Sequence, residues 1–226
     1  MLNSYLVIAI RHLLRQRLYS AINIFGLAIG MTCAVLIASL IQYELSYDQQ
    51  YRNSDRIFRI SRDFFPSDEE PFELHLAAIA PQAAPLLLQD FPQIEQVARI
   101  NCCGSVLLSN ERNNFYDDGL VMADNELFEL FDFEWLEGSA EDALAAPYRL
   151  VLTETTAEKY FGSTSPIGRS LVIEGEYSAE VTGVIRDLPH NTHLKFNALL
   201  SLSTAESIFG EGYLDDWGSN NFHTYV

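Results

Sequence analysis

The chain has 226 residues, 48% of them hydrophobic, three cysteines and a formal net charge of −17. The charge is unevenly divided: residues 1–43 hold three arginines and no acidic residue, whereas residues 44–226 hold 11 basic and 31 acidic residues, a net charge of −20. So acidic a domain is a poor partner for nucleic acid, because phosphate binding needs a basic surface.

Residues 1–17 are predicted to hold an amphipathic helix, from residue 2 onward. Arg11 and Arg15 lie four residues apart, on a different face from apolar residues that recur at three- and four-residue spacing. Those apolar residues are Leu2, Tyr5, Leu6, Ala9, Leu13 and Leu14. This pattern is typical of a helix in the membrane interface; the alternative is an extension of the apolar segment that follows. His12, Arg15 and Arg17 argue against burying it in lipid.

Residues 18–43 are predicted to form a transmembrane helix. They are 26 consecutive residues without a charge, and as a helix they would span roughly 39 Å, more than the hydrocarbon core of about 30 Å. Because Arg11, Arg15 and Arg17 precede this run, the positive-inside rule places the N-terminus in the cytoplasm and residues 44–226 outside. A cleaved signal peptide is the alternative, but its apolar region is usually about 7–15 residues long and ends in a small-residue cleavage site, which is not evident here.

Within the predicted span, Gly26, Gly30 and Ala34 recur every four residues and form one small-residue stripe that continues to Ala38. Small residues let a second helix approach closely, and the amide of Asn23 favours a packing partner within the membrane. We therefore predict helix packing through Asn23, Gly26, Gly30 and Ala34. Chance composition of an apolar segment is the alternative.

Residues 44–226 are long enough for one domain or two small lobes. Strands and helices are interspersed, which predicts an α+β or mixed α/β class. Strands are expected at 56–63, 94–100, 115–122, 150–152, 171–173, 180–186 and 196–201. Helices are expected from Pro81 to about residue 89, at 125–131 after an Asp124 cap, at 154–160 between a Thr153 cap and Gly162, and at 204–209. The acidic stretch 67–71 is expected to be an exposed loop, and the expected core residues are Ile57, Ile60, Val97, Val121, Val151, Val181 and Val184.

The cysteines indicate little chemistry. Cys33 falls in the predicted span. Cys102 and Cys103 are neighbours, so on a strand their side chains point to opposite faces and a disulfide between them would be strained. The simpler interpretation is two partly buried thiols without a disulfide, and a reactive thiol is the alternative.

Residues 162–170 resemble a phosphate-binding loop only superficially. Five residues separate Gly162 and Gly168, where the motif needs four, and Arg169 stands where the motif needs lysine. The segment also follows a predicted helix and precedes a strand, the reverse of the order that the motif requires. We expect a turn and no bound nucleotide.

His190 and His193, close to Asp187, are too few to predict a metal site, because no fourth ligand is evident. A structured turn is expected, in which the change His193→Ala would affect only local stability. The acid pairs 117–118 and 215–216 lack the spacing of a calcium loop and are expected on a solvated face. No nucleophile, base and oxyanion hole assemble from the sequence, so no catalytic residue and no cofactor are predicted.

The chain nevertheless resembles the N-terminal part of a MacB/FtsX-type ABC transporter permease. The similarity is carried by several segments in the family's order rather than by one motif. They are AIRHLLR (9–15), NIFGLAIG (23–30), Tyr47-Asp48, SDRIFRI (54–60), FPQIEQVAR (91–99), 123–131, TETTAEKYFG (153–162), the turn 166–168, and VTGVIRDLP (181–189) with His193.

The resemblance implies a bacterial inner-membrane protein whose residues 44–226 form a MacB-like periplasmic core domain. Such permeases are not enzymes; they are dimeric assemblies that work with a separate cytoplasmic ATP-binding subunit and with further permease helices. A periplasmic adaptor is a further implied partner. The motion driven by the ATPase would reach substrate or partner proteins through the periplasmic domain. The family's substrates are drugs, peptides, lipoproteins or lipids, and this sequence does not select among them.

Family members continue into further membrane spans, which this sequence lacks. It is therefore expected to be a fragment, a truncated reading frame or one piece of a split permease. Two other hypotheses remain open: a single-pass anchored sensor or adaptor whose acidic domain binds an external ligand, and an anchored periplasmic enzyme. An enzyme would need a convergent polar pocket, which the sequence does not indicate.

Overall fold

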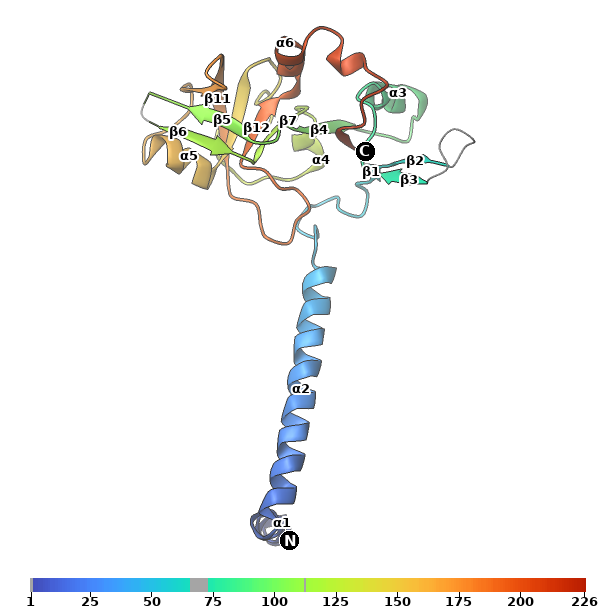
Figure 1. The fold of residues 1–226 in the computed structure, drawn as a ribbon, viewed down its shortest axis with the longest axis vertical. Coiled ribbons are helices and arrows are strands. Elements are labelled where there is room, and N and C mark those ends of the chain that lie inside the picture. Colours follow the sequence, from blue (N-terminus) through green and yellow to red (C-terminus); the bar gives the residue numbers. More distant parts are fainter. Residues whose placement is uncertain (1, 66–72, 112) are drawn as a thin grey trace. The chain divides into compact units, whose positions relative to one another are not determined.

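The computed structural model describes residues 2–65, 73–111 and 113–226 (Figure 1). The chain divides into two compact units, Met1–Tyr47 and Asp48–Val226. The predicted acidic loop 67–71 lies outside the described residues, as do the side chains of Leu2, Leu6 and Ala9 on the predicted apolar helix face.

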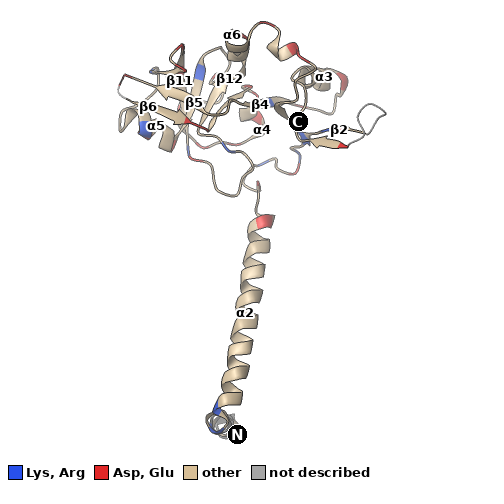
Figure 2. Cartoon of the chain, viewed as in Figure 1, with Lys and Arg blue, Asp and Glu red and all other residues tan. Residues whose placement is uncertain are grey.

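Two helices make up the first unit. Helix α1 (Leu2–Arg15) and helix α2 (Arg17–Leu45) are separated at Gln16, which has non-helical dihedrals. The break therefore precedes Arg17 instead of following it, and Arg17 begins α2. Ser46 ends α2, where its backbone N–H and its hydroxyl both bond to carbonyls of the last turn. The 29 residues of α2 are long and apolar enough to cross a membrane, and Figure 2 shows charged residues only near its two ends.

The second unit is built on one mixed sheet. The described residues form an 11-stranded sheet in the order β1-β13-β4-β7-β12-β9-β11-β10-β5-β6, with β8 paired to β11. Its strands are β1 (Arg59–Ile60), β4 (Ala98–Cys102), β5 (Val106–Ser109), β6 (Asn114–Asp117), β7 (Leu120–Ala123), β8 (Trp135–Glu137), β9 (Arg149–Thr153), β10 (Ser170–Ile173), β11 (Tyr177–Ile185), β12 (Ala198–Ser201) and β13 (Phe222–Tyr225). The pairs β7–β12 and β9–β11 are parallel and the other pairs of this sheet antiparallel. A hairpin of β2 (Arg62–Phe64) and β3 (Leu74–Leu76) forms a second, small sheet. The predicted α+β class is confirmed.

The central strands are apolar on both faces because both faces are covered. In β7, Leu120 and Met122 belong to one hydrophobic cluster, whereas the alternate residues Val121 and Ala123 belong to another. The first cluster includes residues of α5 (Glu154–Phe161) and α6 (Ala205–Phe209), and the second includes residues of α4 (Leu127–Leu130). Period-two alternation therefore divides each strand between two cores. Helix α3 (Ala83–Asp90) and the 3₁₀ turns Leu202–Thr204 and Tyr213–Asp215 complete the elements.

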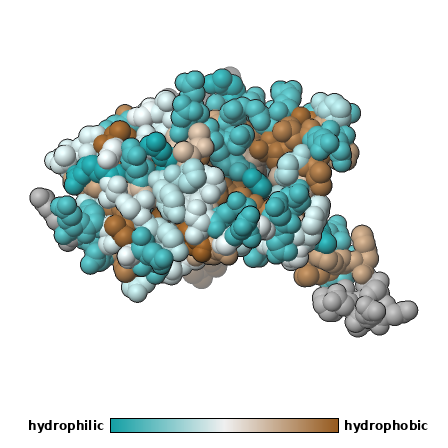
Figure 3. All heavy atoms as spheres, turned by 90° about the horizontal axis from the view of Figure 1, so that it is seen from above, coloured by the Kyte–Doolittle hydropathy of each residue, from teal (hydrophilic) through white to brown (hydrophobic). Residues whose placement is uncertain are grey.

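The predicted core is largely confirmed. Val97, Val121, Val151, Val181 and Val184 are all buried, with at most 8% of each residue exposed. Ile57 and Ile60 are only half-buried, because they lie at or beside β1, a two-residue strand at the edge of the sheet. On the face of the unit shown in Figure 3, hydrophilic side chains predominate and hydrophobic atoms show between them.

Several predicted boundaries are wrong for identifiable reasons. The predicted strand 115–122 is two strands, β6 and β7, separated by a turn at Gly119, whose N–H donates to the carboxylate of Asp117 at 2.9 Å. Asp124 does not cap a helix with its side chain. Its two oxygens instead accept from Nε and Nη2 of Arg99 at 2.8 and 3.0 Å, and only the short α4 follows.

Other boundaries differ by a few residues. Strand β4 begins at Ala98 and not at 94, α3 begins at Ala83 and not at Pro81, and β11 begins at Tyr177 and not at 180. The strand expected at 56–63 is β1 and part of β2, and strands β3, β5, β8 and β13 lie outside every predicted strand. Thr153 does precede α5, and Gly162 does end it with a positive φ of 62°.

Candidate functional site

Asp48 is the first residue of the sheet unit, shortly after α2 ends. Its backbone is left-handed, with φ of 59°, a conformation that costs a non-glycine residue about 1 kcal/mol and that Asp tolerates better than most. Its N–H donates to the carbonyl of Asn191 at 2.9 Å. Its carboxylate accepts hydrogen bonds from Thr192 Oγ1 at 2.7 Å, from the His193 N–H at 3.0 Å and from His193 Nδ1 at 2.8 Å. Four hydrogen bonds thus fasten the start of the unit to the loop 186–197 between β11 and β12.

The hydrogen bonds continue from this loop into the sheet. His193 Nε2 lies 2.9 Å from the hydroxyl of Tyr225 in β13. With Nδ1 donating to Asp48, a neutral imidazole accepts from Tyr225 at Nε2. The Tyr51 hydroxyl lies 2.9 Å from Thr192 Oγ1, and it donates because Thr192 gives its own proton to Asp48. We call Asp48, Tyr51, Thr192, His193 and Tyr225 the Asp48 network.

These contacts determine which groups of the Asp48 network are ionised. Burial opposes the charge on Asp48, but hydrogen bonds from Thr192 and His193 outweigh it and lower the pKa of the carboxyl below its usual value. Burial raises the pKa of Tyr225 to about 12 and also raises the pKa of Tyr51. At neutral pH the network therefore has an ionised carboxylate and two protonated phenols.

A carboxylate, an imidazole and a hydroxyl in line resemble a catalytic triad, but the chemistry differs. A triad needs a hydroxyl that can be activated as a nucleophile and that substrate can reach. Only 4% of the residue Tyr225 is exposed, and its raised pKa keeps the phenol protonated. The Asp48 network is therefore suited to holding the entry of the domain against the sheet.

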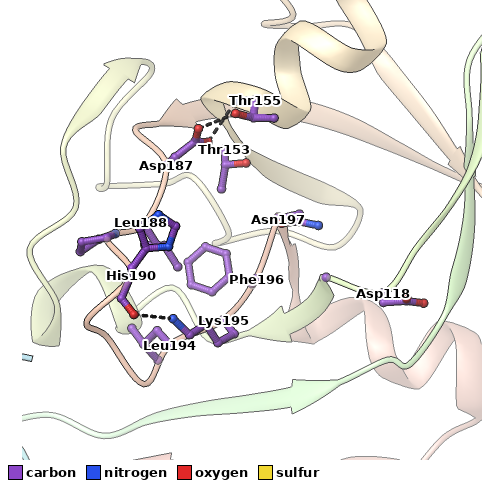
Figure 4. Close-up of a pocket in the computed structure, with 12 residues that line it drawn as sticks. Asp118, Thr153, Thr155, Asp187, Leu188, His190, Leu194, Lys195, Phe196 and Asn197 are labelled. Carbon is purple, nitrogen blue, oxygen red and sulfur yellow. Dashed lines mark hydrogen bonds between the residues drawn. The ribbon is translucent and has the colours of Figure 1, made fainter. Parts of the chain in front are cut away.

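The other side of the same loop forms an open pocket of about 510 Å³ (Figure 4). Asp187 accepts a hydrogen bond from the N–H of Thr155 at 3.0 Å, and a second bond joins its carboxylate to the Thr155 hydroxyl. This contact satisfies a free N–H in the first turn of α5, a role that the sequence assigned to Thr153. Lys195 Nζ donates to the carbonyl of His190 at 3.0 Å. The two histidines singled out in the sequence therefore separate, since His190 lines this pocket and His193 belongs to the Asp48 network.

Asp117 was expected on a solvated face, and this is wrong. Only 4% of the residue is exposed. It accepts from Asn197 Nδ2 at 3.0 Å, from the N–H of Gly119 at 2.9 Å and from Lys159 Nζ at 3.3 Å. Burial opposes its charge, but these donors lower its pKa. A Cβ at Gly119 would meet the Asn197 side chain at 2.5 Å, so glycine is needed beside this buried carboxylate.

The glycine-rich segment is a turn. Gly162 ends α5, and Gly168 donates to the Val181 carbonyl at 2.8 Å on the way into β10. The guanidinium of Arg169 lies over the ring of Phe161, 4.5 Å from its centroid. The order of helix, turn and strand is the one expected from the sequence.

The residues predicted to set topology and helix packing lie in the first unit. Arg11, Arg15 and Arg17 are exposed on α1 and at the start of α2. The predicted packing residues Asn23, Gly26, Gly30 and Ala34 are exposed on α2. A Cβ placed on Gly26 or Gly30 would meet nothing within 4 Å in the described part of the chain. The stripe is thus open, and its packing role stays a prediction.

The chain thus combines a helix that is long and apolar enough to cross a membrane with a mixed-sheet domain that holds a polar network. Residues 20–224 match the model of the MacB-like periplasmic core domain family. The chain belongs to this family, and it is therefore the external domain, with its N-terminal helix, of an ABC-type permease. The resemblance noted in the sequence is confirmed. Family membership also makes this a non-catalytic part of a transporter, as predicted.

Solved structures show the same fold. A permease-protein domain from Porphyromonas gingivalis is 22% identical, with a TM-score of 0.66 over 78% of this chain and 74% of that one. The extracellular domain of the ABC-type transporter YknZ from Gram-positive bacteria is 19% identical, with a TM-score of 0.51 over 74% and 82%. The periplasmic region of MacB from Actinobacillus actinomycetemcomitans is 17% identical, with a TM-score of 0.51 over 74% and 72%. No curated protein matches the chain.

Proposed function

We propose that the external domain transmits motion driven by a cytoplasmic ATPase from α2 to substrate or partner proteins outside the inner membrane. In this proposal the N-terminus is cytoplasmic and residues 44–226 are periplasmic. The partners are a separate ATP-binding subunit, the remaining helices of a dimeric permease and, outside, a periplasmic adaptor. The family and the fold support this role.

The Asp48 network carries the proposal. Motion of α2 enters the external domain along the chain through Asp48. Four hydrogen bonds join Asp48 to the loop 186–197, and His193 extends the connection to Tyr225 of β13. Strand β13 pairs with β4, and β4 with β7 in the middle of the sheet. A displacement at Asp48 would therefore move the sheet and not only a flexible linker.

Hydrogen exchange on the complete permease with its ATPase tests this coupling. We expect addition of ATP to change the exchange of the amides in residues 186–197. The change Asp48→Ala should abolish this response and leave ATP hydrolysis intact, because it removes the acceptor that holds the loop. The exposed Asp55 offers a matched control, since Asp55→Ala should leave the response unchanged. If the exchange of these amides in the original permease does not change with ATP, the proposal is contradicted. Such a result would favour a single-pass anchored sensor or adaptor that binds an external ligand.

The proposed orientation of the chain in the membrane can be tested with reporter fusions. A reporter that is active only in the cytoplasm should be silent when fused after Val226 and active when fused before α1. The reason is the Arg11, Arg15 and Arg17 cluster opposite an external domain of charge −20. Strong activity of the fusion after Val226 would show that this topology is wrong.

Gly30→Leu should weaken association of α2 with the rest of the permease, because a branched side chain blocks close backbone approach. Co-purification of α2 with the other permease helices measures the effect. Leu36→Ala, at an exposed position outside the four-residue repeat, is the control and should change little. If the Gly30 variant co-purifies with the other helices as the original chain does, the small-residue stripe has no packing role and reflects chance composition.

A further inference from the structure

A cavity of about 320 Å³ lies beside the Asp48 network. Its polar lining includes Asp48, Arg59, His193 and the hydroxyl-bearing Tyr225, and its apolar lining includes Phe131. The volume is at the lower end of the range for ligand sites, about 300–1,000 Å³. A molecule the size of one amino acid suits such a cavity better than a longer one.

The cavity presents one positive and one negative group. Arg59 lies in β1 directly opposite Tyr225 in β13, so their side chains share one face of the sheet. Arg59 is exposed, and its guanidinium is a hydrogen-bonding partner of the Tyr225 hydroxyl. Among the described residues no carboxylate lies within 4.0 Å of it in an ion pair. A guanidinium offers paired donors that match the two oxygens of a carboxylate. Because a guanidinium has five N–H donors, Arg59 keeps donors for a carboxylate from outside the chain besides the one directed to Tyr225.

Asp48 supplies the opposite charge. Its Oδ1 accepts from the Thr192 hydroxyl and from the His193 N–H, whereas its Oδ2 accepts only from His193 Nδ1 and can take one further donor. About 29% of the Asp48 side chain and 30% of the His193 side chain stay exposed, so solutes can reach them. A ligand with two negative charges would be repelled by Asp48, and a purely cationic ligand would be repelled by Arg59. A ligand that carries both charges matches both residues.

We propose that this cavity binds the zwitterionic head of an α-amino acid. The carboxylate of the ligand pairs with Arg59, its ammonium group approaches Oδ2 of Asp48, and its side chain lies against Phe131 and Ile57. This site goes beyond the coupling role and does not depend on it. A peptide C-terminus shares the carboxylate but lacks the neighbouring ammonium, so the two ligand classes can be told apart.

Titration calorimetry on the full chain in detergent tests the site. The probes are the common free amino acids at millimolar concentration and, for each that binds, its amide, its N-acetyl derivative and the carboxylic acid without the amino group. We expect saturable binding of at least one apolar amino acid. Loss of either charge on the ligand should weaken binding at least tenfold, as should Arg59→Gln.

Arg52 provides the matched control, because its side chain is 81% exposed and does not line the cavity. Arg52→Gln should bind the amino acid as the original chain does. If the N-acetyl derivative binds as strongly as the free amino acid, the ammonium group is not recognised. The proposal of a zwitterionic ligand would then be wrong, and a peptide C-terminus would be indicated. Absence of saturable binding to every free amino acid, or binding that Arg59→Gln leaves intact, would overturn the site itself. Neither result depends on ATP-driven exchange, so this proposal and the coupling proposal fail separately.

Discussion

Val184→Asp should abolish folding of the external domain. Val184 is 4% exposed in the main hydrophobic cluster. It lies in β11, where it is paired with Leu152 of β9 on one side and with Glu137 of β8 on the other. An isolated carboxylate at this position must either ionise without a partner or take up a proton, and both cost several kcal/mol. Loss of the packed side chain adds to this, against a total stability of about 5–15 kcal/mol for a typical domain.

Circular dichroism and thermal unfolding of the full chain measure this effect. We expect the variant to lack the cooperative transition of the sheet domain. Ser178→Asp is the matched control, because it adds the same carboxylate at an exposed position of the same strand. If the Val184 variant unfolded cooperatively near the unfolding temperature of the original chain, Val184 would not be buried in the core.

The parts of the fold that could be predicted are those with local causes. The apolar run of α2 is visible because lipid demands an uninterrupted segment. Helix α5 could be placed between Thr153 and Gly162, since a helix needs particular residues at its ends, although Thr153 makes no side-chain capping bond. The burial of Val121, Val151 and Val181 could be predicted because strands covered on both faces are continuously apolar.

The candidate site could not be predicted, because it depends on residues far apart in the chain. Asp48 and His193 are separated by 145 positions, and no local pattern relates them. His193 was therefore interpreted as part of a local turn, whereas it bonds to Asp48 and also to Tyr225. Asp117 was misjudged for the same reason, because the donors Lys159 and Asn197 come from distant segments. In the sequence, nothing about a pair of acidic residues indicates whether their carboxylates are buried or exposed to solvent.

Asp48→Asn should lower the free energy of unfolding by about 2 kcal/mol at pH 7, since the bonds lost are to a charged acceptor. An amide also offers the wrong group to one of the donors from Thr192 and His193. Urea unfolding of the full chain measures the difference. The exposed Asp55 again gives the control, because Asp55→Asn should stay within about 0.5 kcal/mol of the original chain.

The difference between the Asp48 variant and the original chain should depend on pH in one direction. The pKa of Asp48 is lowered in the folded protein, against about 3.9 for an unperturbed aspartate. Its contribution to stability is therefore fully present above about pH 4 and is lost as the pH falls through the lower, folded pKa. Asp117 has a lowered pKa as well and adds acid sensitivity of the same sign. Because Asp117 is present in both proteins, its effect cancels when their unfolding free energies are subtracted. The difference attributable to Asp48 should be constant from neutral pH down to about pH 4 and shrink below it. A difference that stays constant into stronger acid would mean that the lost stability does not come from the charge on Asp48, and that the network holds the loop by shape alone.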